Sequence, residues 1–488
     1  MLPLVSAQLL AVTDKKGNLT YIGASDFGVE QFQNIFYGQD TSGANRFAPP
    51  IPFECAAGSV IDATQSGAWC PQGTGPILPF TSVIANISEN CLSLRIARPY
   101  GTQPNAKLPV MIWVHGVFGF AKSQALLDVG HTNAGLRDQR LAFEWVRNNN
   151  KAFGGDPERG LNFNTKSDLV AKNTADVAQE AGCIRDGDSQ SAETLKFLKE
   201  APFELLTNLS ITAARAARPP FGGGFFFPIF DGDLIEDAPS EQLRAGKIAQ
   251  GIPILAEWST NDGGWYASPT TSTDQDALSS FGLWLSGLSD ITNSKLLDLY
   301  PEGDFAFMVD IWFTCPVVDF ARQYLKHGGV RASQVHVAAH NSSRFTPIYA
   351  AMGVPQWRVA HLSDIPYVLD SQSVAAGGDN SAPQLDLSRG ISRSIASFVT
   401  SGIPDGVPGL ETWPPAFDGA SAWELEQGRP SRLTLEVKVG PFGNTVATIG
   451  NTTNAASETG AQAALNRERL YGRCSFINSK SFREEAGV

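Results

Sequence analysis

The sequence predicts an α/β protein with a central, mostly parallel sheet flanked by helices. The first indication is the continuous apolar run Leu108–Val114, which ends at His115-Gly116 and predicts a strand buried on both faces, as in a parallel sheet. The second is an alternation of short β-type runs with longer segments of helical periodicity. Strands that alternate with amphipathic helices are typical of α/β folds.

The expected elements follow one another along the chain. Residues 1–60 alternate short apolar runs with glycine and asparagine turns, so we expect small strands there. Asn133 is a candidate N-cap for a helix that extends to about Asn149. Ile252–Ala256 and Val335–Ala339 are short strand candidates.

Two further helices are predicted by apolar stripes of helical spacing, and the second is closed by Gly402 with Pro404 just beyond. The two stripes consist of Val317, Val318, Ala321, Tyr324 and Leu325, and of Leu387, Ile391, Ile395, Phe398 and Val399.

Composition excludes several classes of protein. Apolar residues make up 42% of the 488 residues and charged residues 18%, which is typical of a globular protein with a sizeable core. The net charge of −12 argues against a nucleic-acid partner, because phosphate backbones require a basic face. There is no run of 18 apolar residues, so we expect no membrane span.

Several features favour an oxidising, extracytoplasmic compartment. The N-terminus is apolar and contains Val5-Ser6-Ala7, which resembles the end of a secretory signal, but it lacks a basic region and fits a plain strand equally well. The six cysteines contain no Cys-x-x-Cys pair, which argues against structural zinc and favours disulfides. Five glycosylation sequons point to secretion, and they begin at Asn18, Asn86, Asn208, Asn341 and Asn451.

A series of motifs carries a family resemblance. In chain order they are Asn34–Gly38, Arg46–Pro50, Ser88–Leu92, Asn133–Trp145, Phe153–Arg159, Asp231–Asp233, Ser259–Gly264 and Trp357–Tyr367. Together they resemble the type-B carboxylesterase/lipase family, and its secreted fungal members most closely. The resemblance implies one α/β-hydrolase domain over residues 1–488, a small-molecule or lipid ester as substrate, and no cofactor or metal.

The chemistry of this family is acyl transfer by a serine, a histidine and an acid. By resemblance His361 is the base, and Asp262 is the acid at a position where the family usually has glutamate. The resemblance also implies a disulfide between Cys70 and Cys91. It leaves open the partners of Cys55, Cys183, Cys315 and Cys474.

The catalytic serine is missing from the pattern, because no Gly-x-Ser-x-Gly occurs in the sequence. Gly116, the remnant of the oxyanion loop, leads directly into Val117–Ala121, which resembles a later part of the family. Only 16 residues separate Gly116 from Asn133, too few for a glycine loop, a crossover and another parallel strand. After Arg159 the elbow strand is also absent. We therefore expect an incomplete fold that lacks two core strands, poor solubility and no triad-type hydrolysis.

Other serines do not replace the nucleophile. Ser167 has no neighbouring glycine to relieve the strain of an elbow, and Ser25 lies in the N-terminal strands, out of order. Two interpretations stay open: an ester hydrolase with a truncated sequence, and a non-catalytic α/β-hydrolase-like binding protein. A metal hydrolase that uses His336 and His340 is disfavoured, because this pair sits in a strand-like run without an intervening glutamate. The aromatic cluster at 225–227 is either an acyl pocket or core.

Overall fold

The computed structural model describes most of the chain and divides it into two compact units. The first unit comprises Met1–Ile77 and Thr81–Ala238, and the second Leu78–Phe80 and Pro239–Val488. The single domain over residues 1–488 stays a prediction. The described residues are 8–75, 83–104, 106–108, 110–112, 119–153, 168–217, 226–267, 271–285, 287–301, 304–371, 381–404, 415–417, 420–421, 425, 432–439, 444–450 and 470–486.

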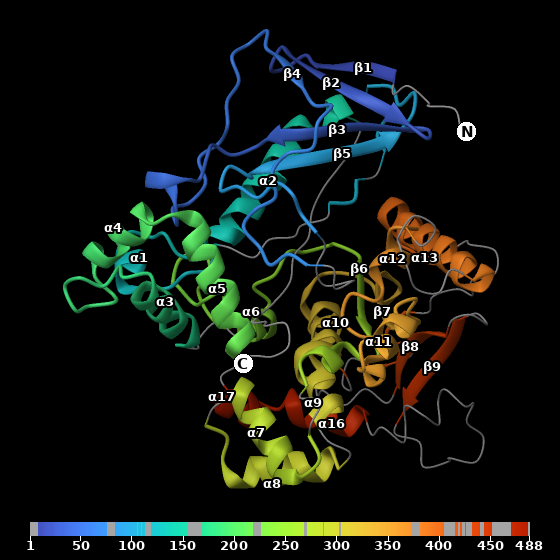
Figure 1. The fold of residues 1–488 in the computed structure, drawn as a ribbon. Coiled ribbons are helices and arrows are strands. Elements are labelled where there is room, and N and C mark those ends of the chain that lie inside the picture. Colours follow the sequence, from blue (N-terminus) through green and yellow to red (C-terminus); the bar gives the residue numbers. More distant parts are fainter. Residues whose placement is uncertain are drawn as a thin grey trace. The chain divides into compact units, whose positions relative to one another are not determined.

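The first unit contains the N-terminal sheet that the sequence predicts (Figure 1). Its strand order is β1-β2-β3-β5, all antiparallel, with the short β4 parallel to β2. Val12, Tyr21 and Phe32 form the buried face, against which Trp145 of a helix packs. The strands are β1 (Gln8–Asp14), β2 (Leu19–Asp26), β3 (Val29–Phe36), β4 (Val60–Asp62) and β5 (Ser93–Pro99).

The helices in the described residues of the first unit are α1 (Gln124–Asp128), α2 (Ala134–Phe153), α3 (Leu169–Glu180), α4 (Ala192–Glu200) and α5 (Phe203–Ala217). Helix α2 is the one predicted from Asn133, and it contributes Trp145 to the core of the sheet. Helices α3, α4 and α5 enclose a second apolar cluster around Val177, Leu198 and Leu206.

Asn133 starts α2 in a different way from the predicted side-chain cap. Its φ is +53°, and its carbonyl accepts the amide of Leu136 at 3.0 Å, as expected at a helix start. Its side chain, however, donates to Ile229 O at 2.8 Å and to Asp231 Oδ2 at 2.7 Å. The amide of Ile229 donates back to Asn133 Oδ1 at 2.8 Å. A side chain engaged with residues almost a hundred positions away cannot also cap its own helix, so it serves tertiary structure instead.

The second unit contains the mostly parallel sheet. Its order is β6-β7-β8-β9, with parallel pairs up to β8 and an antiparallel β9 at the end (Figure 1). Strands β6 (Ile254–Ser259) and β7 (Val335–Asn341) confirm the two short strand candidates. The remaining strands are β8 (Arg432–Val439) and β9 (Asn444–Gly450).

Strand β7 is buried on both faces, and its alternation separates two layers. Val335, Val337 and Ala339 join the main core of this unit. On the other face His336 lies edge-on to the ring of Phe398, and His340 lies 4.8 Å from the ring of Tyr367, measured between centroids. Four residues along a strand span about 13 Å, too far for two side chains to share one metal ion. The helical spacing that a His-x-x-x-His metal site requires is therefore not present here.

The helices of the second unit confirm both predicted stripes. The first stripe lies on α10 and the second on α13, which ends at Gly402 with φ +76°. A disulfide between Cys315 and Cys474 ties α10 to α16. The longer helices are α7 (Asp274–Trp284), α8 (Asp290–Leu299), α10 (Cys315–His327), α13 (Ala382–Ser401) and α16 (Leu470–Ile477), and the shorter ones α6 (Pro239–Arg244), α9 (Asp304–Val309), α11 (Thr346–Ala351), α12 (Ile365–Val368) and α17 (Lys480–Ala486).

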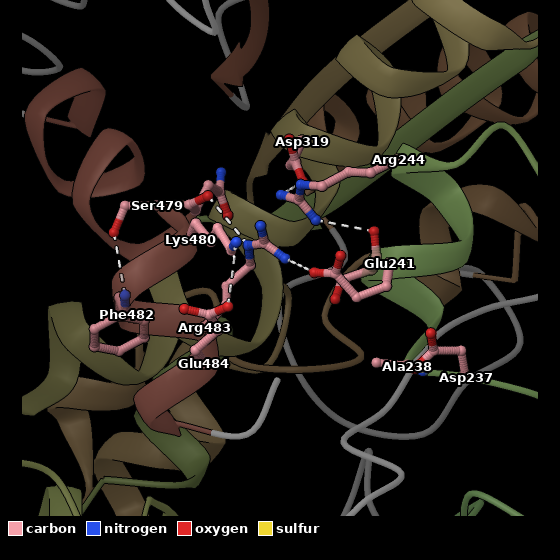
Figure 2. A network of polar contacts seen from close by, with 12 residues as sticks. Asp237, Ala238, Glu241, Arg244, Asp319, Ser479, Lys480, Phe482, Arg483 and Glu484 are labelled. Carbon is pink, nitrogen blue, oxygen red and sulfur yellow. Dashed lines mark hydrogen bonds and ion pairs between the residues drawn. The ribbon is translucent and has the colours of Figure 1, made fainter.

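A charged network joins three of these helices, as Figure 2 shows. Arg483 of α17 pairs with Glu241 of α6, and Arg244 of α6 pairs with Asp319 of α10. Arg322 also donates to Asp319, at 2.7 Å. Since Asp319 is almost fully buried, its two arginine partners offset the cost of removing its charge from water. The network holds the C-terminal helix against the start of the unit.

One predicted strand is not found. Leu108 and residues 110–112, the described part of the run Leu108–Val114, lie outside any strand. A strand of a parallel sheet forms only where neighbours complete its hydrogen-bond ladder, and none of the described strands pairs with this run. Within the described ranges, no helix combines the length and apolarity that crossing a membrane requires.

Candidate active site

Asp262 and His361, the acid and the base that the family resemblance singles out, are in direct contact. His361 Nδ1 lies 2.9 Å from Asp262 Oδ1. The Asp262 side chain is 5% exposed and that of His361 32% exposed, so the acid is buried and the imidazole reaches solvent. With Nδ1–H donated to the carboxylate, Nε2 is left as the acceptor that a general base requires.

The acid is positioned by the end of β6. Its second oxygen, Oδ2, accepts the backbone amide of Ser259 at 2.6 Å. The amide of Thr260 donates to His340 O at 2.9 Å, and the amide of Asn261 donates to Val359 O at 3.1 Å. The acid turn is thereby tied both to the end of β7 and to the loop that carries the histidine. This arrangement explains why two motifs about one hundred residues apart meet.

Gly263 allows this turn to pack closely against α9. A Cβ at this position would lie 2.2 Å from the backbone nitrogen of Val309 and 2.6 Å from the carbonyl carbon of Met308. Since backbone atoms cannot swing aside, only glycine fits this contact. The Asp-Gly-Gly sequence therefore reflects close packing next to the acid.

Aromatic rings and a strained loop orient the histidine. The ring of His361 lies 5.1 Å from Phe313 and 5.8 Å from Tyr266, measured between centroids. Phe313 belongs to a π-helical turn, Asp310–Thr314, between α9 and α10, and such turns are frequent at functional sites. Leu362, next to the histidine, has φ +66°, a conformation that costs energy for a residue with a Cβ.

A second carboxyl group lies close to the pair. Burial, followed by the negative charge of Asp262, raises the pKa of Asp364 from 3.8 to about 6. As the pH falls below about 6, the neutral form of this side chain predominates, and the imidazole then faces one carboxylate rather than two. The sequence motif Ser-Asp-Ile-Pro-Tyr contains Asp364, but nothing in its spacing indicates this electrostatic coupling.

A nucleophile is not found beside the histidine in the described part of the chain. No hydrogen bond joins His361 to a serine hydroxyl there. Ser25 lies on β2 in the first unit, and Ser363 is buried with its hydroxyl on Ser343 Oγ at 3.1 Å. Gly116, Ser167 and Phe225 lie outside the described residues.

Other family motifs meet in pairs in the first unit. Arg46 holds Glu89 with two hydrogen bonds, of 2.6 and 2.7 Å, and thereby joins the Arg46–Pro50 and Ser88–Leu92 segments. The expected Cys70–Cys91 disulfide is present. The partner of Cys315, which the sequence leaves open, is Cys474, whereas Cys55 and Cys183 are free thiols.

The sequence profile of the carboxylesterase family matches residues 13–117, 116–159 and 300–436 of this chain, together more than half of its length. Among curated proteins, one named "Inactive carboxylesterase-like protein VdtD" from Byssochlamys spectabilis is 32% identical over 457 residues. The match covers 74% of this chain and 78% of that protein. A secreted lipase of Arthroderma benhamiae is 26% identical over 571 residues of alignment, which cover 97% of this chain and 95% of the lipase.

Solved structures establish the fold. The crystal structure of Aspergillus niger EstA superimposes with a TM-score of 0.70 at 16% identity, over 98% of this chain and 99% of that one. A thermophilic PNB esterase gives 0.69 at 20% identity, over 94% and 99%. These neighbours have the α/β-hydrolase fold, in agreement with the parallel sheet of the second unit. The fold, the profile match and the relatives together show that this chain belongs to the carboxylesterase family.

Proposed function

We propose that this chain is a carboxylesterase-family α/β-hydrolase that retains the acid and the base of an ester-hydrolysing site but lacks the nucleophile, so that it does not turn over esters by the triad mechanism. The observation that carries the proposal is the 2.9 Å contact between Asp262 and His361 without a serine hydroxyl on the imidazole in the described residues. Small-molecule or lipid esters are the substrate class of the intact site.

The breaks in the family match support this proposal. The profile match stops and restarts at Gly116–Val117 and stops again at Arg159, the two places where the motifs lose continuity. The alignment to the Arthroderma benhamiae lipase has 571 positions, more than the 488 residues of this chain, so it contains gaps. Loss of a triad serine costs on the order of 10⁶ in rate, and loss of one oxyanion donor a further ~10²–10³.

The edge of the parallel sheet also supports a loss of strands. Among the described strands β6 pairs only with β7, although β6 leads into the acid turn and both its ends are buried. Parallel strands are normally covered on both sides, and an unpaired edge promotes association. We expect most of the full chain to enter the insoluble fraction on expression. A chain that is soluble and monodisperse at milligram concentrations would contradict this expectation.

The direct test is a short-chain p-nitrophenyl ester assay on the soluble fraction. We expect the parent chain, His361→Ala and the control His327→Ala, a change at the end of α10, to show the same rate as buffer. Turnover by the parent that His361→Ala abolishes and His327→Ala leaves unchanged would refute the proposal, because it would require a nucleophile elsewhere in the chain.

The alternative is a non-catalytic α/β-hydrolase-like binding protein. It is favoured by the relative from Byssochlamys spectabilis, which is named as an inactive carboxylesterase-like protein. Sequencing the transcript across Gly116–Val117 and Arg159–Gly160 separates the two. Additional coding sequence at these junctions indicates a truncated ester hydrolase, and continuous sequence indicates a binding protein.

Secretion is part of the same proposal. Similar proteins include secreted lipases of Arthroderma benhamiae and Botryotinia fuckeliana. The structure contains two disulfides, which persist in oxidising compartments. Of the sequon asparagines, Asn18, Asn86 and Asn208 are exposed and Asn341 is half-buried, whereas Asn451 lies outside the described residues.

A further inference from the structure

The first unit contains a cavity of about 140 Å³ with mainly apolar walls. It lies between the loop after β3, the Cys70–Cys91 disulfide and helices α2, α3 and α5. Its apolar lining includes Phe47, Phe120, Leu198, Leu206 and Phe226. An apolar cavity of about 150 Å³ in another protein holds one benzene ring, so this space admits one compact apolar group.

Among the described residues, three charged side chains line this cavity, and two of them neutralise each other. Arg46 and Glu89 form a bidentate ion pair. The remaining Arg46 nitrogen, Nη1, donates to Leu198 O at 2.8 Å and to Ala201 O at 2.6 Å. Arg46 is therefore engaged by the Glu89 carboxylate and by the carbonyls of Leu198 and Ala201. Of the described lining residues, only Asp138 contributes a charge that no neighbour balances.

Asp138 lies on α2 and has an unsatisfied carboxyl group. It makes no hydrogen bond and no ion pair in the described part of the chain. Burial raises its pKa from 3.8 to about 7. Burial, followed by the negative charge of Asp138, raises the pKa of nearby Tyr37. A carboxylate in apolar surroundings is costly unless a cation or a donor meets it. Thr207 and Ser210 of α5 are also buried in this wall, and their hydroxyls are likewise unpaired in the described residues.

We propose that this cavity is a binding site for a small organic ammonium ion with a compact apolar body. The body replaces water along the phenylalanine and leucine wall, and the ammonium group donates to the Asp138 carboxylate. A neutral ligand of the same shape makes the apolar contacts but forms no charged hydrogen bond with Asp138. The described residues that line the cavity belong to the first unit, whereas Asp262 and His361 belong to the second, and the proposal does not depend on ester hydrolysis.

The test compares benzylammonium with benzyl alcohol, which has nearly the same shape and no charge. Calorimetric titration of the soluble full chain at pH 8 is expected to give about tenfold tighter binding of the ammonium, the size of effect that a charged hydrogen bond provides. At pH 5.5, where Asp138 is protonated, the difference is expected to fall below about threefold. Neither Glu89, paired with Arg46, nor Tyr37, which is neutral at both pH values, accounts for such a change.

Variants distinguish this site from nonspecific binding. Asp138→Asn removes the unpaired carboxylate and is expected to fold at least as well, to bind benzyl alcohol as before and to lose the ammonium preference. Ser210→Leu fills the cavity from α5 and is expected to weaken both probes. Asp176→Asn, an exposed position on α3, is the control and is expected to change neither. Equal affinity for the two probes, no saturable binding, or a preference that survives Asp138→Asn would each overturn the proposal.

Discussion

Replacing Gly263 by alanine should destabilise the second unit, because the added methyl group has no space. The new Cβ would lie 2.2 Å from Val309 N, 2.6 Å from Met308 C and 2.8 Å from Met308 Cβ. Met308 is fully buried, so α9 cannot move away without disturbing the core. Overpacking of this kind costs about 1–3 kcal/mol, and contact with backbone atoms places Gly263→Ala near 3 kcal/mol.

The assay is thermal unfolding of the soluble fraction at low concentration. For a unit of this size 1 kcal/mol corresponds to about 2–4 °C, so we expect a decrease in Tm of about 6–12 °C. The matched control is Gly282→Ala on α7, where an added Cβ meets no atom within 4 Å. Alanine in an exposed helix is favoured over glycine by about 0.5–1 kcal/mol, so the control should raise the Tm slightly.

The same change from glycine to alanine is thus expected to lower the Tm at position 263 and to raise it at position 282. A Gly263→Ala protein that melts within about 1 °C of the parent would show that the acid turn does not pack against α9 as described. A destabilising Gly282→Ala change of similar size would show that the effect is not specific to the contact.

Two other measurements follow from the structure. Replacing Cys315 and Cys474 by serine should lower the free energy of unfolding by about 5 kcal/mol, against about 3 kcal/mol for Cys70 and Cys91, because the first disulfide closes 159 residues of chain and the second 21. The denaturant midpoints of the two double variants measure this difference. A larger loss of stability at Cys70–Cys91 would contradict the entropic argument. Asp364 has a pKa of about 6 in the folded chain, against 3.8 for the unfolded chain. Between pH 4 and 6 the folded state therefore holds a proton that the unfolded state has lost, so the stability of the fold falls as the pH rises through this range. Asp364→Asn should reduce this fall in stability by about 2 kcal/mol, which is less than the full value of the pKa shift because part of the carboxyl surface meets solvent. An unchanged dependence of stability on pH would count against the raised pKa.

Local patterns predicted those parts of the fold that depend on local physics. The helices at 315–327 and 382–401 follow from apolar stripes that match the helical repeat, and Gly402 ends the second in the left-handed conformation that its type predicts. The strands at 254–259 and 335–341 follow from short apolar runs. The run at 108–114 has the same local signal, but a strand also requires neighbouring strands that complete its hydrogen bonds. The pattern of residues within the run does not determine whether such neighbours exist.

The candidate site shows the same division. Sequence motifs selected Asp262 and His361 one by one, from the residues around each. They did not indicate Asp364 as a second carboxyl near the pair, the need for Gly263, or the ring of Phe313 against the imidazole. Each of these depends on a distance between segments that the chain order leaves open.

By itself, the sequence determined the family of this protein and singled out Asp262 and His361 as its candidate acid and base, because contiguous motifs carry the family resemblance and surround each of the two residues. The tertiary structure alone decided that Asp262 and His361 touch, that Cys315 pairs with Cys474, and that Asp138 lines an apolar cavity with no partner among the described residues. Contacts of this kind arise from packing between segments that are distant in the sequence. This packing sets the distances between the side chains and their burial, and both determine whether a titratable group is charged.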